Sequence, residues 1–206
     1  MTLIRRSKPL HPFEANLLRE KVHRTIKHRS YLEAPPGEEF TLVSGNKSKY
    51  YLDLKPTLFD PQGANDVAEL ALNELENTWV DYVGGLAVGA VPLATAMTLL
   101  SYRFDCPLPG FFVRKQMKDH GTKYLVEGLP RGEDLTGKRV VIVDDVTTEG
   151  KSAMHAVDAA KQAGGEVVLV LSIVDREEGA EEFFRRHSLP FKCLFRAKEF
   201  FNSKPS

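Results

Sequence analysis

The run VVIVDDVTTEGKS, residues 140–152, constrains the fold of this chain most strongly. Its first four residues are apolar and β-branched, as in a strand that is buried on both faces of a parallel sheet. Two adjacent carboxylates, Asp144 and Asp145, follow, and a turn rich in Thr, Gly and Ser then opens a helical pattern. Because ligands of α/β sheets bind at the carboxyl ends of strands, the run predicts a ligand site at this edge of a parallel sheet.

The chemistry of this run suits a phosphorylated sugar. Free backbone N–H groups at the N-terminus of the following helix can hold a phosphate. Asp144 and Asp145 can accept hydrogen bonds from vicinal hydroxyls, or help to hold a divalent metal. A core strand followed by two solvated aspartates is the alternative interpretation, in which the run has no function.

Three other folds do not fit the run. A Walker P-loop requires glycine five residues before a Gly-Lys-Ser sequence, but Asp145 occupies that position relative to Gly150. A receiver domain also begins with a strand and paired aspartates, yet it needs more chain after the run than this sequence has. A dinucleotide-binding turn contains Gly-x-Gly-x-x-Gly, which is absent here.

The composition excludes several classes of protein. The 206 residues include 28 basic and 28 acidic side chains, and this neutral balance indicates neither a nucleic-acid surface nor a membrane-binding face. Cys106 and Cys193 lack metal-ligand spacing, which favours a reducing cytosol over a disulfide scaffold. The N-terminus has no apolar signal segment, and no later segment approaches a membrane span. We therefore expect a cytoplasmic protein with one α/β domain.

The rest of the chain predicts strands that alternate with helices. Residues 40–54 alternate in polarity around a Ser-Gly-Asn turn and predict a hairpin. Apolar residues at helical spacing predict a peripheral cap helix over 11–30. The other expected elements are strands at 79–83, 111–113, 140–143 and 167–174, and helices that begin at Asp60-Pro61, Pro92 and Ala153. This alternation predicts a parallel sheet with right-handed crossovers.

Three glycines lie between the predicted strand at 79–83 and the next helix. At Gly84, Gly85 and Gly89 the missing side chains would let backbone amides approach an anion closely. Glycines in such loops often serve tight packing alone, so both interpretations stay open.

The segment RKQMKDHG, residues 114–121, concentrates cations in a long polar stretch that runs to Glu133. Long polar loops in compact domains are often mobile lids over sites. Lys115, Lys118 and His120 could stabilise charge that builds up on a leaving diphosphate, and His120 could also donate a proton. A solvated surface loop is the alternative.

Two further segments carry groups suited to a flat, charged substrate. Arg176 follows the strand at 167–174, and its guanidinium can form a bidentate pair with a planar carboxylate. An intramolecular salt bridge is the alternative. Residues 44–51 (SGNKSKYY) offer amides, two lysines and two aromatic rings that can stack on a heterocycle beside a phosphate, or they form an ordinary hairpin.

Together these motifs resemble the orotate phosphoribosyltransferases, type I phosphoribosyltransferases, from about Phe40 to Gly179. The run at 140–152 is similar to the family's phosphoribosyl pyrophosphate motif, which alone indicates only the superfamily. Residues 114–121 match the Arg-Lys-x-x-Lys-Asp-His-Gly lid that separates the orotate enzymes from the purine ones. Two further matches are Ser44-Gly45 with Ser48-x-Tyr50, and Asp175-Arg176-x-x-Gly179.

The resemblance implies the type I phosphoribosyltransferase fold, in which helices flank a central, mostly parallel sheet of an α/β protein. A small cap, or hood, would come from the N-terminal segment and the C-terminal tail. Residues 1–206 would form one phosphoribosyltransferase domain, with a hood segment at 1–59, a core at 60–180 and a C-terminal part at 181–206. The implied reaction transfers the phosphoribosyl group of 5-phospho-α-D-ribose 1-diphosphate to orotate in pyrimidine biosynthesis, giving orotidine 5′-monophosphate and diphosphate.

The resemblance also implies roles for the matching positions. Asp144 and Asp145 would contact the ribose hydroxyls, and they share the catalytic roles with Lys118 and His120. The substrate-binding positions would be Arg114, Lys115, Lys118 and His120 for the diphosphate, Val146, Thr147, Thr148, Glu149, Gly150, Lys151 and Ser152 for the 5′-phosphate, and Thr148, Arg176, Tyr51 and Leu52 for orotate.

The implied cofactor is Mg²⁺ carried by the diphosphate, with Asp144 and Asp145 as the side chains that would help to hold it. The implied partners are the two small-molecule substrates and a second copy of the chain. In that homodimer Lys115, Lys118 and His120 would reach across the interface into the neighbouring site.

Two positions depart from the family pattern. Many bacterial members have lysine at the positions of Val43 and Val88, so two phosphate contacts are missing here, with Lys47 as a substitute for one of them. Two alternative functions stay open. A regulator that senses phosphoribosyl pyrophosphate is disfavoured by the neutral charge and the lid, and an enzyme for another base is disfavoured by the lid.

Overall fold

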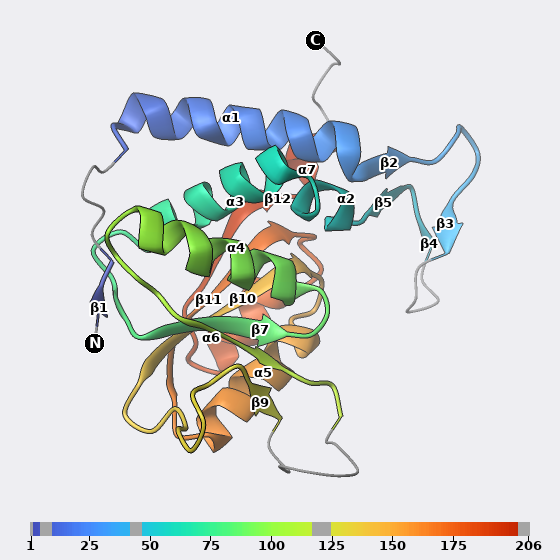
Figure 1. Cartoon of the computed structure of the whole chain (residues 1–206). Coiled ribbons are helices and arrows are strands. Elements are labelled where there is room, and N and C mark those ends of the chain that lie inside the picture. Colours follow the sequence, from blue (N-terminus) through green and yellow to red (C-terminus); the bar gives the residue numbers. More distant parts are fainter. Residues whose placement is uncertain (1, 5–9, 42–46, 117–124, 202–206) are drawn as a thin grey trace.

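The four strands predicted around 79–83, 111–113, 140–143 and 167–174 join two further strands, β9 (Val126–Glu127) and β12 (Phe191–Arg196), in one central sheet. The computed structural model describes residues 2–4, 10–41, 47–116 and 125–201 (Figure 1). The strands of the sheet are β7 (Tyr82–Leu86), β8 (Gly110–Val113), β9 (Val126–Glu127), β10 (Arg139–Thr147), β11 (Glu166–Asp175) and β12 (Phe191–Arg196). Within the described residues their order is β12-β11-β10-β7-β8-β9. All neighbours are parallel except β8 and β9, which confirms a mostly parallel sheet.

Helices cover both faces of this sheet (Figure 1). Because neighbouring side chains of a strand point to opposite faces, β10 contributes to two separate cores. Val141 and Val143 belong to the core with α3 (Pro61–Glu74) and α4 (Ala90–Arg103). Val140 and Ile142 belong to the core with α5 (Lys151–Gln162) and α6 (Ala180–Arg186). Burial on both faces explains why this strand is continuously apolar in sequence.

The N-terminal helix packs on α3 and also contacts the C-terminal helix. In α1 (Pro12–Arg29) the ring of His23 stacks on Phe200 of α7 (Lys198–Phe201), with 4.6 Å between ring centroids. Arg19 of α1 pairs with Glu199 of α7 at 2.7 Å. These contacts join α1 to α7. The other short elements are β1 (Thr2–Leu3), β2 (Tyr31–Glu33), β3 (Phe40–Thr41), β4 (Lys47–Ser48), β5 (Tyr50–Leu52), α2 (Lys55–Leu58) and β6 (Trp79–Val80).

The predicted hairpin is confirmed, since β3 and β4 pair antiparallel, although its turn residues 42–46 lie outside the described residues. The pairing of β5 with β2 and the presence of β9 in the polar segment are features that the sequence did not predict. Helix α4 begins at Ala90 and not at Pro92, because proline is tolerated throughout the first turn. None of the helices in the described part of the chain has the length and apolar character needed to cross a membrane.

The prediction of a glycine loop that begins at Gly84 is wrong, because β7 continues through Gly84 and Gly85. A Cβ at Gly85 would lie 2.2 Å from the carbonyl oxygen of Val143, and a Cβ at Gly84 would lie 2.6 Å from the ring of Phe111. These two glycines therefore allow close packing inside the sheet. Gly89, at the start of α4, is the one of the three that remains in the loop.

Candidate active site

The acid pair lies where the carboxyl ends of β7, β10 and β11 meet. Thr147 at the end of β10 is in register with Asp175 at the end of β11. A Cβ at Gly89, after β7, would lie 2.6 Å from a carboxylate oxygen of Asp145. Asp144 is buried and Asp145 is partly buried. The edge of the sheet therefore brings the loop after β7 and the acid pair together, as the topology of a parallel sheet requires.

A chain of hydroxyl groups holds Asp144. The Oγ1 atom of Thr147 lies 3.0 Å from Oδ2 of Asp144 and 2.9 Å from Oγ of Ser172, whose hydroxyl donates to the carbonyl oxygen of Val174 at 3.0 Å. Burial and then the charge of Asp145 raise the pKa of Asp144 to about 7. The hydroxyl of Thr147 donates to the Asp144 carboxyl, and this hydrogen bond opposes the rise.

Asp145 has a different environment. Burial raises the pKa of Asp145, and the backbone N–H of Val146 and the charge of Lys55 oppose that rise. Lys55, at the start of α2, is held in place by Asp53, whose Oδ1 lies 2.8 Å from the ammonium nitrogen. The N-terminal segment thus supplies a cation to the acid pair, which eases the cost of two neighbouring carboxylates.

The turn after the acid pair leaves the start of α5 open to an anion. Gly150 has a φ of +87°, a left-handed conformation, and a Cβ there would lie 2.9 Å from Phe183 and 3.0 Å from Phe184. Glycine is therefore required for both conformation and space. The helix N-terminus has no side-chain cap, and the exposed Lys151 pairs with Glu149. Its first backbone N–H groups are available to a phosphate.

Arg176 joins the hairpin to the end of β11. Its backbone N–H donates to the carbonyl oxygen of Thr147 at 2.9 Å. Its buried guanidinium donates to Ser48 at 3.3 Å and to Glu178 at 2.8 Å, and lies over the ring of Tyr50 at 4.5 Å from the centroid. A cationic group that suits a planar carboxylate is therefore next to the phosphate turn.

The other predicted hairpin residues lie around this position. Tyr51 is 40% exposed and Leu52 is buried. The ring of Tyr51 packs on Phe40, with 6.0 Å between centroids. The ammonium group of Lys47 donates to the hydroxyl of Thr41 at 2.8 Å, so its described contact lies within the hairpin.

Several residues at this edge were given no role from the sequence. The structure adds Asp53, Lys55, Ser172 and Glu178. For Ser48 and Tyr50, which lie in the predicted 44–51 segment, it adds the contacts with Arg176. Lys55 and Ser172 had no signal in the sequence, because their partners come from distant parts of the chain.

Comparison with known proteins agrees with this geometry. Residues 57–184 match the phosphoribosyl transferase domain family. A Rhodopseudomonas palustris (strain ATCC BAA-98 / CGA009) protein named orotate phosphoribosyltransferase is 56% identical over 165 residues, which cover 80% of this chain and 88% of the relative. The chain belongs to the orotate phosphoribosyltransferase family.

Solved structures of orotate phosphoribosyltransferases share its fold. The Mycobacterium tuberculosis H37Rv enzyme in complex with Fe(III) dicitrate has a TM-score of 0.73 and 33% identity, covering 89% of this chain and 98% of that chain. The same enzyme in complex with 5-phospho-alpha-D-ribosyl 1-diphosphate has a TM-score of 0.71 and 31% identity, covering 89% and 99%. The predictions of fold class, family and enzymatic function in pyrimidine biosynthesis are confirmed.

The segment 114–121, which was predicted to be a cationic lid, lies partly within the described residues. Arg114 pairs with Glu127 on the neighbouring strand β9 at 3.2 Å. Lys115 is exposed, and Lys118 and His120 lie outside the described residues. The antiparallel pairing of β8 with β9 brings the two ends of the lid segment together.

Of the two positions at which many bacterial orotate phosphoribosyltransferases carry lysine, Val88 is within the described residues and Val43 is not. Val88 is 68% exposed, in the loop whose next residue, Gly89, touches Asp145. An apolar side chain therefore stands where a lysine would bring a cation close to the acid pair.

The residues at this edge fit the Mg²⁺ that the sequence resemblance implies. Adjacent carboxylates supply the oxygen donors that Mg²⁺ prefers. Among the described residues, no group of three or more His, Cys, Asp or Glu side chains could hold a metal ion. A site with at most two protein carboxylates suits a metal that arrives on substrate phosphates, since Mg²⁺ is usually bound in that way.

Proposed function

We propose that this edge of the sheet transfers the phosphoribosyl group of 5-phospho-α-D-ribose 1-diphosphate to orotate, giving orotidine 5′-monophosphate and diphosphate. The observation that carries the proposal is the position of Arg176, beside the phosphate turn and the acid pair. One site thereby combines Arg176, which can bind a carboxylate, with the acid pair for the ribose hydroxyls and the turn for the phosphate. Orotate is a planar base that bears a carboxylate, so it matches this combination.

The 5′-phosphate would bind at the turn from residue 147 to residue 152. The uncapped backbone N–H groups of α5 and its dipole favour an anion there. The exposed hydroxyls of Thr148 and Ser152 are further donors. Asp144 and Asp145 would then accept hydrogen bonds from the ribose hydroxyls, which fixes the sugar between the phosphate and the base.

Orotate would lie on the hairpin side of the same turn. Its carboxylate would pair with Arg176, and the backbone near Tyr51 and Leu52 would bind the polar edge of the ring. Ser48 and Tyr50 support this role because they hold the guanidinium in place from two directions. Thr148, which follows directly on the Thr147 carbonyl that Arg176 binds, would be the remaining contact.

Bond breaking places positive charge on the ribose and negative charge on the leaving diphosphate. The lid would supply Arg114, Lys115, Lys118 and His120 to the diphosphate, and His120 would donate a proton to it. Closure of the lid would also keep water from the sugar. Bound Mg²⁺ would neutralise part of the charge on the diphosphate.

We further propose that the enzyme is a cytoplasmic homodimer in which the lid of one subunit reaches the site of the other. Exposed apolar side chains on and beside α4, namely Val88 (68%), Leu99 (66%) and Tyr102 (75%), support an interface on this face. The free thiols of Cys106 and Cys193 support a reducing compartment.

The test is to incubate the full chain with orotate, phosphoribosyl pyrophosphate and Mg²⁺ and to follow the loss of orotate absorbance. We expect orotidine 5′-monophosphate and diphosphate in equal amounts, and no reaction after chelation of Mg²⁺. Reactions with a purine base or uracil in place of orotate are the control. Consumption of one of these bases without turnover of orotate would refute the proposal.

A further inference from the structure

Arg176 already has a carboxylate partner within its own loop. Its Nε donates to Oε1 of Glu178 at 2.8 Å, and its side chain is only 6% exposed, whereas that of Glu178 is 37% exposed. Burial of a guanidinium without a counter-charge costs free energy, so Glu178 neutralises a charge that would otherwise be buried alone. Among the described residues, no other carboxylate pairs with Arg176.

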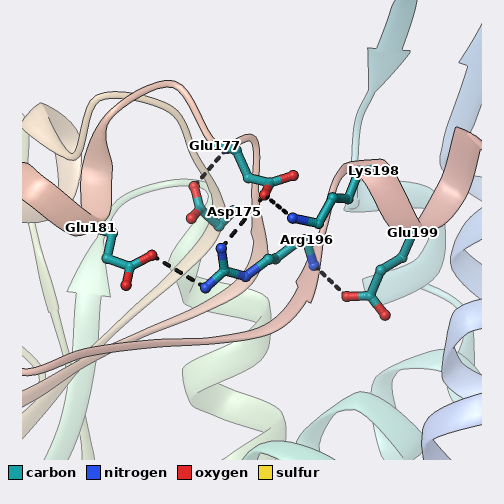
Figure 2. Close-up of polar contacts among 6 residues, drawn as sticks. All are labelled: Asp175, Glu177, Glu181, Arg196, Lys198 and Glu199. Carbon is teal, nitrogen blue, oxygen red and sulfur yellow. Dashed lines mark hydrogen bonds and ion pairs between the residues drawn. The ribbon is translucent and has the colours of Figure 1, made fainter.

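The residues on either side of Arg176 in sequence, Asp175 and Glu177, are anchored by a network of polar contacts that does not include the guanidinium. Figure 2 shows the carboxylate of Glu177 directed toward Arg196 and Lys198 of the C-terminal segment, and that of Asp175 directed toward the backbone of Glu177. Asp175 accepts the backbone N–H of Glu177 at 2.9 Å. The carboxylate of Glu177 pairs with Lys198 at 2.7 Å and with Arg196 at 3.5 Å.

This network is held in turn by elements outside the loop (Figure 2). Arg196, the last residue of β12, pairs with Glu181 of α6 at 3.2 Å, and its backbone N–H donates to Glu199 of α7 at 2.7 Å. The backbone N–H of Ala197 donates to the carbonyl oxygen of Asp175 at 2.8 Å. The backbone of the loop is therefore fixed without any contribution from Glu178.

The side chain of Glu178 can consequently rotate away from Arg176 without disturbing the backbone of this loop. In the described part of the chain its carboxylate has no cation partner other than Arg176, and its partial exposure gives it a path to water. Rotation of its side chain would free the Nε edge of the guanidinium. The contacts with Ser48 at 3.3 Å and with the ring of Tyr50 at 4.5 Å would keep the guanidinium in position.

We propose that Glu178 stands in for the carboxylate of orotate, pairing with Arg176 until orotate displaces it, and that it thereby limits the affinity for the base. This inference rests on the proposed function, in which Arg176 binds orotate. The guanidinium exchanges one carboxylate for another, so its buried charge stays paired throughout. Orotate gains less binding free energy than it would from an unpaired guanidinium, because the internal pair must first be broken.

The test is Glu178→Gln, which keeps the shape of the side chain and removes its charge. Titration calorimetry of the full chain with orotidine 5′-monophosphate is compared with uridine 5′-monophosphate, which lacks the carboxylate. We expect the Kd for orotidine 5′-monophosphate to fall about five- to tenfold and the Kd for uridine 5′-monophosphate to stay within about twofold. The KM for orotate should fall in parallel.

The matched control is Glu177→Gln, which removes the same charge one residue away and leaves the pair of Arg176 with Glu178 intact. We expect no tightening in this variant. Equal tightening in both variants would show a general effect of loop charge and overturn the inference. Weaker or unchanged binding by Glu178→Gln, with an active wild type, would overturn it alone. A wild type that neither binds orotidine 5′-monophosphate nor consumes orotate would overturn the proposed function as well.

Discussion

The backbone N–H of Arg176 donates to the carbonyl oxygen of Thr147 at 2.9 Å. This bond links the first residue after β11 to the last residue of β10, and so it sets the distance between the proposed orotate site and the phosphate turn. Because both partners are backbone groups, side-chain substitutions at either position change the chemistry of the site and leave this spacing in place.

Replacement of Arg176 by lysine should weaken the binding of orotate selectively. Lysine keeps the positive charge, but it loses the planar fork that binds a carboxylate with two parallel hydrogen bonds. We expect the KM for orotate to rise about 30- to 100-fold and the KM for phosphoribosyl pyrophosphate to change less than about threefold. Steady-state kinetics with each substrate varied in turn measures both. The exposed Arg185→Lys is the control, and an equal rise in both KM values would contradict the assignment.

Replacement of Asp144 by asparagine should make the free energy of unfolding less dependent on pH. Wild type should lose stability as the pH rises, and the variant should not lose this part. The pKa of Asp144 is raised from 3.8 to about 7, mainly by burial. Between these values the folded chain holds a proton that the unfolded chain has lost, so this group makes the protein less stable as the pH rises through this window. Relative to wild type, the variant should gain about 2–3 kcal/mol of stability between about pH 5 and about pH 8.

Urea unfolding of the protein without substrates at both pH values measures this difference. Replacement of the exposed Asp158 by asparagine is the control, and it should leave the pH dependence of wild type unchanged. A free-energy difference between wild type and Asp144→Asn that is the same at both pH values would show that Asp144 does not titrate in this range.

Replacement of Gly150 by alanine should disturb the phosphate turn. The new Cβ would meet Phe183 at 2.9 Å while the residue keeps a left-handed φ of +87°. We expect a loss of about 2–4 kcal/mol in the free energy of unfolding and a higher KM for phosphoribosyl pyrophosphate. Gly132→Ala is the control, because Gly132 has a similar φ of +83° and no atom within 4 Å of a Cβ. Gly132→Ala should lower the free energy of unfolding by only about 1–2 kcal/mol. Equal losses in the two variants would show that contact with Phe183 does not contribute at Gly150.

Replacement of Lys118 by alanine should slow the chemical step. If this lysine stabilises the charge on the leaving diphosphate, its loss should lower kcat about 100-fold or more with little change in the KM for orotate. Rapid-quench measurement of a single turnover separates this step from product release. Lys161→Ala, on the exposed face of α5, provides the comparison. Undiminished single-turnover rates in Lys118→Ala would rule out the lid role.

Local sequence patterns were sufficient to predict the main strands and helices and the ligand site at the carboxyl end of β10. The apolar run before Asp144 could only be a strand buried on both faces, and a parallel sheet places the ends of such strands together. In the structure the ends of β10 and β11 do lie side by side, with Thr147 in register with Asp175. The same reasoning failed at Gly84 and Gly85, since a glycine in a loop and a glycine packed against a neighbouring strand look alike in sequence.

The sequence thus determined the main alternation of strands and helices up to β11, the chemistry at the end of β10, and the resemblance of its motifs to the orotate phosphoribosyltransferases. Only the tertiary structure decided what surrounds each of those groups. Ser48 reaches Arg176 across 128 residues, and the pKa of Asp144 depends on burial by several elements at once. Periodicity and spacing encode contacts along a few turns of chain, whereas contacts between distant segments follow from how the whole core packs.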